Sequence, residues 1–164
     1  MTDYRRWYEA VTGVNPKQNR WDRGPMKTNE ATQARFRKQV EKNRRQIKND
    51  DSYIFSVIEK RSGQLIGAVD FDIFVRSAHQ FANFGYFICN THWGHGYGQE
   101  AARAGLKIGF KQLKLNRLEA AINFDNRKSI RLAKANGMKR EGIKRRYWYE
   151  YGEWVDHLIF VANP

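Results

Sequence analysis

Apolar residues recur with a helical period in two stretches near the start of the chain. Residues 2–12 predict a short helix, whose apolar side carries Tyr4, Trp7, Tyr8 and Val11. A loop at 13–27, rich in turn-forming residues, separates it from a second helix expected from Thr28 to about Lys48. The inward stripe of this second helix is narrow and consists of Phe36, Val40 and Ile47. Most of its other positions are Arg, Lys or Gln, so a largely solvated helix is expected.

From residue 52 onward, strand and helix patterns alternate. Strands are expected at 52–59, 65–75, 81–89, 117–124, 143–151 and 153–161, and helices at 100–113 and 127–136. In the helix at 100–113 the inward residues are expected to be Ala101, Leu106, Phe110 and Leu113, and Gly137 closes the last helix. The order αα-ββ-β-α-β-α-ββ predicts an α/β (α+β) fold with a mixed sheet. At 164 residues, a single domain over 1–164 is expected.

Composition narrows the class of protein. The longest apolar runs are a few residues, far short of the roughly 20 that span a bilayer, so no membrane association is expected. Cys89 is the one cysteine, which excludes an intrachain disulfide, and no secretory signal pattern is visible. These features favour a cytoplasmic protein. No group of His, Cys, Asp and Glu has the spacing of a zinc site, so no metal is expected.

The net charge is +13 and is unevenly distributed. Residues 1–50 carry +7, residues 51–100 carry −2 and residues 101–164 carry +8. Basic ends favour acidic partners, such as RNA, the ribosome or a polyphosphate cofactor. A merely solvated surface is the equally simple interpretation.

The stretch Phe84–Ala101 is the most informative in the chain. An apolar strand leads into the turn Trp93-Gly94-His95-Gly96-Tyr97-Gly98, which opens into a helix near Gln99. Such a turn gathers free backbone N–H groups at the positive end of a helix dipole, where a phosphate binds well. A dinucleotide-binding interpretation is poorer, because no acidic residue ends a second strand about 20 residues on. His92 and His95 are expected to be surface residues.

A second motif, Asn126-Arg127-Lys128-Ser129, opens the helix at 127–136. Taken alone it is a helix N-cap, in which Asn or Ser satisfies free amides. In register with the upstream glycine turn, it also becomes a candidate ligand-binding motif.

These motifs together resemble the GNAT superfamily of acyl-CoA-dependent N-acetyltransferases, most closely its RimJ/RimL-like branch, which acts on ribosomal-protein N-termini. The matching segments are Gly85-Tyr86-Phe87-Ile88, Trp93–Ala101, Arg117–Ile122, Asn126–Ser129, Gly137-Met138, Glu141-Gly142 and Asp156. The resemblance implies a GNAT fold, with a mixed central sheet splayed at the cofactor cleft and helices on both faces. It also implies acetyl-CoA as the cofactor.

The resemblance assigns cofactor contacts residue by residue. The pyrophosphate is expected on Trp93, Gly94, His95, Gly96, Tyr97, Gly98 and Gln99. The pantetheine arm is expected to pair with the strand carrying Phe87, Ile88 and Cys89, and to bond Asn126. Lys128 is expected near the adenosine phosphate, and Ser129 near the thioester.

Catalytic residues are less clear. Direct attack on the thioester needs a neutral amine and a proton for the leaving thiolate. Ser129 stands where the branch carries a serine and is the candidate acid, since the tyrosine used by many GNATs is replaced by Ala133. The branch's glutamate base is replaced by Trp148. Glu119 and Glu141, with Glu150 as a further candidate, remain as possible bases, although a structural role is the simpler interpretation of each.

The absence of the branch's usual base bears on which amine is the acceptor. Making a lysine side chain neutral at pH 7 costs about 4.6 kcal/mol, against about 1.4 kcal/mol for an α-amine. An N-terminal α-amine of a protein or peptide is therefore the expected acceptor, with polyamines and aminoglycosides as alternatives. Two other classes stay open: a CoA-binding GNAT fold without catalysis, and a basic module that binds nucleic acid or the ribosome. The expected oligomeric state is monomer or homodimer.

Overall fold

The computed structural model describes residues 3–164, which fall into two compact units. The first unit holds the described residues up to Asp70 together with Tyr86–Gly98. The second holds Phe71–Gly85 and Gln99–Pro164. Two strands and one helix contribute residues to both units.

The helices and strands follow one another in the predicted order. They are α1 (Asp3–Thr12), α2 (Gln33–Lys48), β1 (Ser52–Ile58), β2 (Leu65–Val75), β3 (Phe81–Ile88), the short 3-10 helix η1 (Asn90–His92), α3 (Tyr97–Lys111), β4 (Arg117–Asn123), α4 (Arg127–Ala135), β5 (Lys139–Glu150) and β6 (Glu153–Ala162). The strands are hydrogen-bonded in the order β1-β2-β3-β4-β6-β5. This mixed α/β arrangement confirms the predicted fold class. No helix within residues 3–164 has the length and apolar character to cross a membrane.

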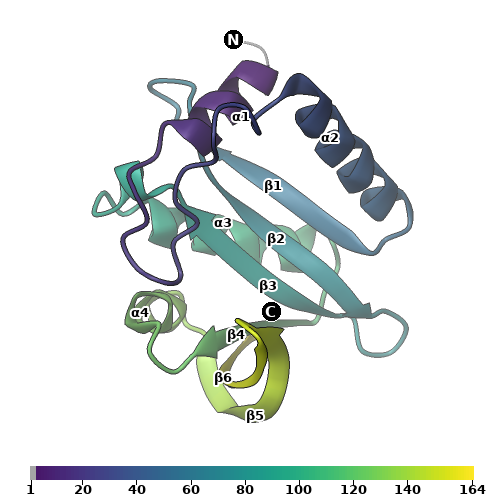
Figure 1. Cartoon of the computed structure of the whole chain (residues 1–164). Helices are drawn as coiled ribbons and strands as arrows, with labels where there is room; N and C mark the ends of the chain where they lie inside the picture. The colour runs from purple at the N-terminus through teal and green to yellow at the C-terminus, as the bar shows by residue number, and fades with distance from the viewer. Residues whose placement is uncertain (1–2) are drawn as a thin grey trace. The chain divides into compact units, whose positions relative to one another are not determined.

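In the first unit, α2 lies along β1 and contacts α1 (Figure 1). The Phe36 ring packs on Tyr4 and Trp7, with ring centroids 5.8 and 5.5 Å apart, as the inward stripe predicted. Ile47 is 46% exposed, so its assignment to that stripe was wrong. The predicted start at Thr28 was also wrong, because Thr32 is the N-cap: its hydroxyl oxygen accepts from the Arg35 amide over 3.2 Å.

The second unit has a core in which the helix approaches a strand closely. Phe71, Phe84 and Leu118 are buried, and the first two rings stack at 5.3 Å. A Cβ on Gly109 of α3 would lie 2.7 Å from the Leu118 side chain and 3.0 Å from the Phe71 ring. The buried face of α3 therefore consists of small residues: Ala101, Ala102, Gly105 and Gly109. Of the inward residues predicted for this helix, only Ala101 is buried.

In the second unit β4 is paired on both sides, and β5 pairs with β6. Phe81–Asn83 of β3 pairs in parallel with Arg117–Glu119 of β4. Both strands continue beyond this short register, to Ile88 and Asn123. β4 then pairs antiparallel with β6, from Leu118 opposite Ala162 to Asn123 opposite His157. The carboxyl end of β4 thus faces His157.

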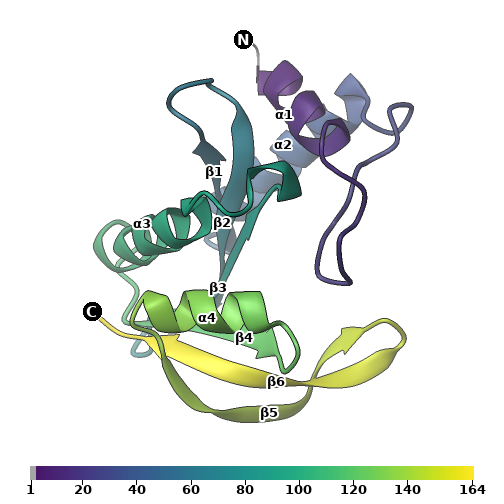
Figure 2. The same cartoon turned by 90° about the vertical axis from the view of Figure 1, so that its left-hand side faces the viewer.

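The β5–β6 hairpin closes the second unit and bends along its length (Figure 2). Its two-residue turn, Tyr151-Gly152, has φ of +54° and +89°, the positive values that a tight hairpin turn with matching strand twist requires. The register is irregular between Lys144 and Trp148, where Arg146 has φ +47°. β5 begins at Lys139, not at the predicted Ile143. Its first residues are exposed and charged, so they lack the apolar alternation that reveals a strand.

Candidate functional site

The glycine turn before α3 has the geometry of an anion-binding site. Gly94 and Gly96 have φ of +85° and +81°, which favour glycine strongly. A Cβ built on either residue would meet nothing within 4 Å, so the space above the turn is open. The helix begins at Tyr97, two residues earlier than expected, and its free amides face the same turn. The turn fits a phosphate or pyrophosphate group.

The turn is fixed at both ends within the first unit. The Trp93 indole Nε1 donates to the Ile88 carbonyl over 2.7 Å, which holds the start of the turn on the last residue of β3. The Tyr97 hydroxyl donates to the Glu59 carboxylate. Hydrogen bonds from the hydroxyls of Ser62 and Tyr97 lower the pKa of Glu59, so this carboxylate is ionised. A rigid turn loses little entropy when a ligand orders it.

The strand predicted to carry the pantetheine arm is also well defined. The Arg23 guanidinium lies 4.0 Å above the Phe87 ring. The Cys89 amide donates to the Ile66 carbonyl over 2.7 Å. Burial raises the pKa of the Cys89 thiol, and its Sγ lies 3.7 Å from the Ala10 carbonyl. The thiol form is favoured, which fits a packing role rather than a nucleophile.

Sequence reasoning missed the hydrogen bonds of Asn90, which follows β3 and binds the loop at 13–27. This set of bonds is called the Asn90 clasp. Asn90 is 7% exposed, and its side chain accepts from the Asn15 amide over 2.8 Å. Its Nδ2 donates to the Asn15 carbonyl over 2.8 Å and to the Asp22 carboxylate over 2.7 Å. Asn90 alone, inside a short Asn-Thr-His stretch, gave no signal of this role. The loop at 13–27 is therefore anchored just before the glycine turn.

In the second unit, Asn126 caps α4. Its Oδ1 accepts from the Ser129 amide over 3.2 Å, which confirms the N-cap interpretation. Its own backbone N–H donates to the Asn123 carbonyl over 3.0 Å. Lys128 is exposed and Ser129 is half-buried on the first turn of α4. Oδ1 accepts in the cap and the backbone N–H is bonded to Asn123, so the side-chain nitrogen Nδ2 is the donor that Asn126 can offer to a ligand.

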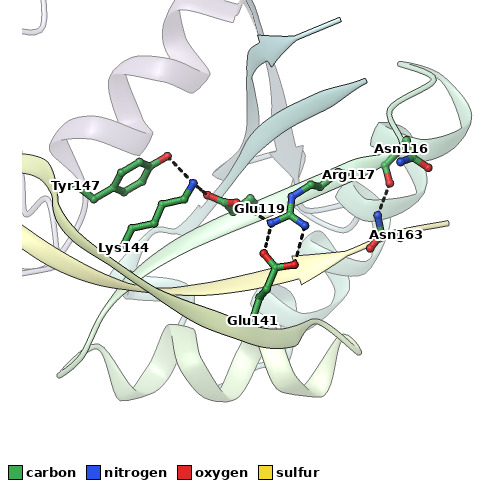
Figure 3. Close-up of polar contacts among 7 residues, drawn as sticks. All are labelled: Asn116, Arg117, Glu119, Glu141, Lys144, Tyr147 and Asn163. Atoms are coloured by element: carbon green, nitrogen blue, oxygen red, sulfur yellow. Dashed lines mark hydrogen bonds and ion pairs between the residues drawn. The ribbon is translucent and has the colours of Figure 1, made fainter. Parts of the chain in front are cut away.

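The two carboxylates predicted as catalytic lie in one ion-pair network (Figure 3). Arg117 contacts both oxygens of Glu141 and lies 3.0 Å from Glu119 Oε2. Lys144 binds the other oxygen of Glu119, which is 1% exposed. The hydrogen bond from Arg117 lowers the pKa of Glu141 and raises that of Arg117. The Glu141 carboxylate, held ionised by a guanidinium, is a weak proton acceptor, and Glu119 is bound on both oxygens by cationic side chains. Both carboxylates therefore fit a structural role better than that of a base.

A third carboxylate, Glu150, has different partners. One of its oxygens accepts from the Asn123 amide over 2.9 Å, and the other lies 3.4 Å from His157 Nε2. His157 is 2% exposed, and its Nδ1 lies 3.1 Å from the Val155 carbonyl. The sequence offered Glu150 as one carboxylate among three, but nothing singled out His157. The chain between them crosses a hairpin whose register is irregular.

An acyl-CoA-dependent acyltransferase is the class of protein that these features define: the strand order, the glycine turn at the start of α3, and Asn126 as the N-cap of α4. The family model "Acetyltransferase (GNAT) domain" matches residues 2–139. The chain is 33% identical over 129 residues to the probable N-acetyltransferase YjcK of Bacillus subtilis, covering 78% of this chain and 71% of that one. The chain belongs to the GNAT acetyltransferase family.

Further relatives include proteins with named substrates. The ribosomal protein uS5-alanine N-acetyltransferase of Escherichia coli is 25% identical over 112 residues, covering 68% of this chain and 58% of that one. A ribosomal-protein-S5-alanine acetyltransferase structure from Vibrio fischeri is 25% identical with a TM-score of 0.69, covering 98% and 83% of the two chains. Other curated relatives are matched over about three fifths of their length, 59% and 61% for the next two.

Two solved structures under 25% identity share the fold. RimJ of Mycobacterium smegmatis, in complex with CoA-disulfide, has a TM-score of 0.78 at 20% identity, covering 98% and 77% of the two chains. A spermidine N-acetyltransferase of Vibrio cholerae has a TM-score of 0.69 at 21% identity, covering 98% and 89%. The resemblance to the RimJ/RimL-like branch is thereby confirmed at the level of family and fold. Proteins of this fold bind acetyl-CoA.

Proposed function

We propose that this N-acetyltransferase moves the acetyl group of acetyl-CoA to the N-terminal α-amine of a protein or peptide, by direct attack. The observation that carries the cofactor assignment is the open glycine turn. Gly94 and Gly96 have positive φ there, and the free amides at the start of α3 follow directly after them in the chain. The pyrophosphate binds these amides from Trp93 to Gln99. Phe87, Ile88 and Cys89 pair with the pantetheine arm, and Lys128 meets the adenosine phosphate.

The donor groups on α4 complete the cofactor contacts. The amide nitrogen of Asn126 donates to the pantetheine arm while its oxygen remains the helix cap. Ser129, held on the first turn of α4 by that cap, protonates the leaving thiolate. Acetyl-CoA supplies the thioester, and the chain's residues position it and manage the protons.

The choice of an α-amine rests on the acceptor's own chemistry. An α-amine needs about 1.4 kcal/mol to become neutral at pH 7, and a lysine-like or polyamine nitrogen about 4.6 kcal/mol. The chain's net charge of +13 also disfavours polycations such as spermidine. Relatives named for acetylating a ribosomal-protein alanine support the same choice.

A steady-state survey tests this proposal. With acetyl-CoA held saturating, kcat/KM is measured for peptides beginning with Ala or Ser, for the same peptides blocked at the N-terminus but containing lysine, and for spermidine and kanamycin. The peptides with a free N-terminus are expected to have the highest kcat/KM. A preference for spermidine, kanamycin or the blocked peptides overturns the acceptor assignment. A lack of saturable acetyl-CoA binding overturns the cofactor assignment.

A second candidate function, contact with RNA, is favoured by α2. The helix carries seven cations and one anion, and it has no buried residue. Arg35 pairs with Glu30, but the other cations have no carboxylate within 4.0 Å among residues 3–164. They are Arg37, Lys38, Lys42, Arg44, Arg45 and Lys48. Such a surface suits a phosphate backbone, and contact with ribosomal RNA would bring the enzyme to nascent or ribosomal protein N-termini.

Charge reversal separates an RNA footprint from net charge. Binding of an RNA duplex of about 20 base pairs is measured between about 50 and 200 mM salt for the wild type and for the triple variant Lys38→Glu, Lys42→Glu, Arg45→Glu. The variant is expected to bind more weakly with a shallower salt dependence, by roughly 0.9 in slope for each phosphate that it no longer neutralises. The matched control reverses the exposed Lys107, Lys111 and Lys114. Equal weakening in the control rules out a role specific to α2.

A further inference from the structure

Buried polar side chains share one face of neighbouring strands in the second unit. Glu119 and Asn123 lie on alternate positions of β4, and His157 lies opposite Asn123 on β6. All three are at most 7% exposed. Buried polar groups are costly unless they are paired, so each needs a partner. Glu119 is paired with Arg117 and Lys144, whereas Asn123 and His157 share one carboxylate, that of Glu150.

The hydrogen bonds of His157 constrain its protons. The Val155 carbonyl only accepts, so Nδ1 of His157 carries a proton and donates to it over 3.1 Å. Nε2 then points at Oε1 of Glu150, 3.4 Å away, while the side-chain amide of Asn123 donates to Oε2 of the same residue over 2.9 Å. Glu150 and His157 therefore form a pair in which buried side chains hold the carboxylate in one orientation.

Other charges near this pair are already committed. On β5, Lys144 lies opposite His157 in the register, but its ammonium binds Glu119 and lies 3.5 Å from the Tyr147 hydroxyl. The Tyr147 ring contacts His157 edge-on with centroids 6.2 Å apart. On β4 the facing residue is the neutral Asn123. Within the described chain, Glu150 is the carboxylate in ion-pair contact with His157.

Glu150 is reachable from solvent, and the residue that orients it is bonded to the N-cap of α4. Asn123, which holds Glu150 Oε2, accepts through its backbone carbonyl from the Asn126 amide over 3.0 Å. The predicted ligand donor Asn126 is thus one turn away from the residue that orients Glu150. The Glu150 side chain is 28% exposed, while that of His157 is 2% exposed. An amine can reach the carboxylate but not the imidazole.

We infer that Glu150 is the general base of the acetyl transfer, and that His157 and Asn123 are positioning residues that orient its carboxylate. The inference rests on the proposed function. Glu150 takes one proton from the acceptor ammonium, and the neutral nitrogen attacks the thioester carbonyl to form the C–N bond. As the C–S bond breaks, Ser129 gives its hydroxyl proton to the thiolate, which leaves as the thiol, and the second nitrogen proton restores the Ser129 hydroxyl. The proton that Glu150 has taken is then released to solvent, giving the net release of one proton per turnover.

The test compares two glutamates of one hairpin. Glu150→Gln removes the base, and Glu153→Gln removes the same charge from the residue opposite Glu150 across the turn. For both variants, acetyl-CoA binding by calorimetry, thermal unfolding and the pH dependence of kcat are measured with an Ala-initiated peptide. Glu150→Gln is expected to lower kcat at pH 7 by about 10²- to 10⁴-fold with acetyl-CoA binding unchanged. Its deficit shrinks toward about pH 9, because an α-amine with a pKa near 8 is then neutral without help.

His157→Gln provides the readout for positioning. Glutamine can keep an N–H near Glu150, but it has no ring whose second nitrogen is fixed by the Val155 carbonyl, so the carboxylate is held less firmly. We expect kcat to fall while KM and acetyl-CoA binding stay unchanged, and an unchanged kcat overturns the role of His157. If the variant does not fold, the Glu150/Glu153 comparison decides alone. Equal kcat for Glu150→Gln and Glu153→Gln overturns the inference while the wild-type activity leaves the proposed function standing. An inactive wild type that still folds overturns both.

Discussion

The side-chain amide of Asn90 donates a 2.7 Å hydrogen bond to the carboxylate of Asp22, 68 residues earlier in the chain. The same carboxylate accepts from the backbone amides of Gln18 and Gly24. A loop that carries Arg23 over the Phe87 ring is thereby held next to the predicted cofactor strand.

This clasp predicts a pH-dependent loop. Partial burial raises the pKa of Asp22, but the hydrogen bonds from Gln18, Asn90 and other donors outweigh it, so the net shift is downward from 3.8. A folded-state pKa below the unfolded one stabilises the closed loop above about pH 4, and this stability is lost as the pH falls further. The protection of the amides of residues 13–24, measured as their exchange rate relative to the intrinsic rate at the same pH, is expected to decrease between about pH 5 and 3. In Asp22→Asn the protection is already low at pH 7 and changes less with pH; an identical pH response would contradict the assignment.

The glycine turn predicts a separation of cofactor binding from stability. Gly96→Val forces a β-branched residue to φ +81°, which costs roughly 1–2 kcal/mol, and places methyl groups over the turn amides. CoA affinity by calorimetry is expected to fall at least about tenfold, equivalent to 1.4 kcal/mol. Gly137→Val is the matched control, since Gly137 has φ +79° and equally open space. If both variants lose CoA affinity equally, the turn has no special role.

Asn126 is expected to separate capping from ligand binding. Asn126→Ala removes the bond to the Ser129 amide and is expected to cost about 1 kcal/mol of stability. Asn126→Asp keeps an oxygen cap but has no amide to donate. Both variants are expected to weaken acetyl-CoA binding, and only Asn126→Ala to lower the melting temperature markedly. Normal CoA binding by Asn126→Asp would limit Asn126 to the cap.

The Arg117 network predicts unequal costs for its two carboxylates. Glu119→Gln leaves Arg117 and Lys144 without their buried partner, at about 3 kcal/mol, the lower end of the range because both cations are partly exposed. A melting temperature lower by roughly 6–12 °C is expected. Glu141→Gln, with a side chain 55% exposed, should cost less than about 1 kcal/mol. Both folded variants are expected to retain kcat. A catalytic base would instead lose kcat without losing stability.

Much of the fold follows from local pattern. The limits of β2 and the N-cap of α4 agree with prediction because alternation and capping chemistry are local properties. The start of α2 was predicted at Thr28, whereas the helix begins after Thr32, and Ala31 in front of Thr32 is buried. The inward face of α3 was missed because Gly105 and Gly109 are buried by close approach to a strand, which their small side chains permit but do not announce.

The site shows the same division. The glycine turn and Asn126 are contiguous motifs and were visible as such. The Asn90 clasp and the Glu150–His157 pair join residues through a long loop and an irregular hairpin. Register shifts at Lys144–Trp148 decide which side chains meet, and the sequence between them does not encode that shift in any periodic way.

Cys89 has a practical consequence for study of the enzyme. It is the chain's one cysteine, it is half-buried, and burial raises the pKa of its thiol. Reaction with a thiol reagent should therefore be slow and should yield a single product. A ligand lying along the end of β3 shields Sγ further, so the rate of labelling reports occupancy of the strand without a spectroscopic probe or a mutation.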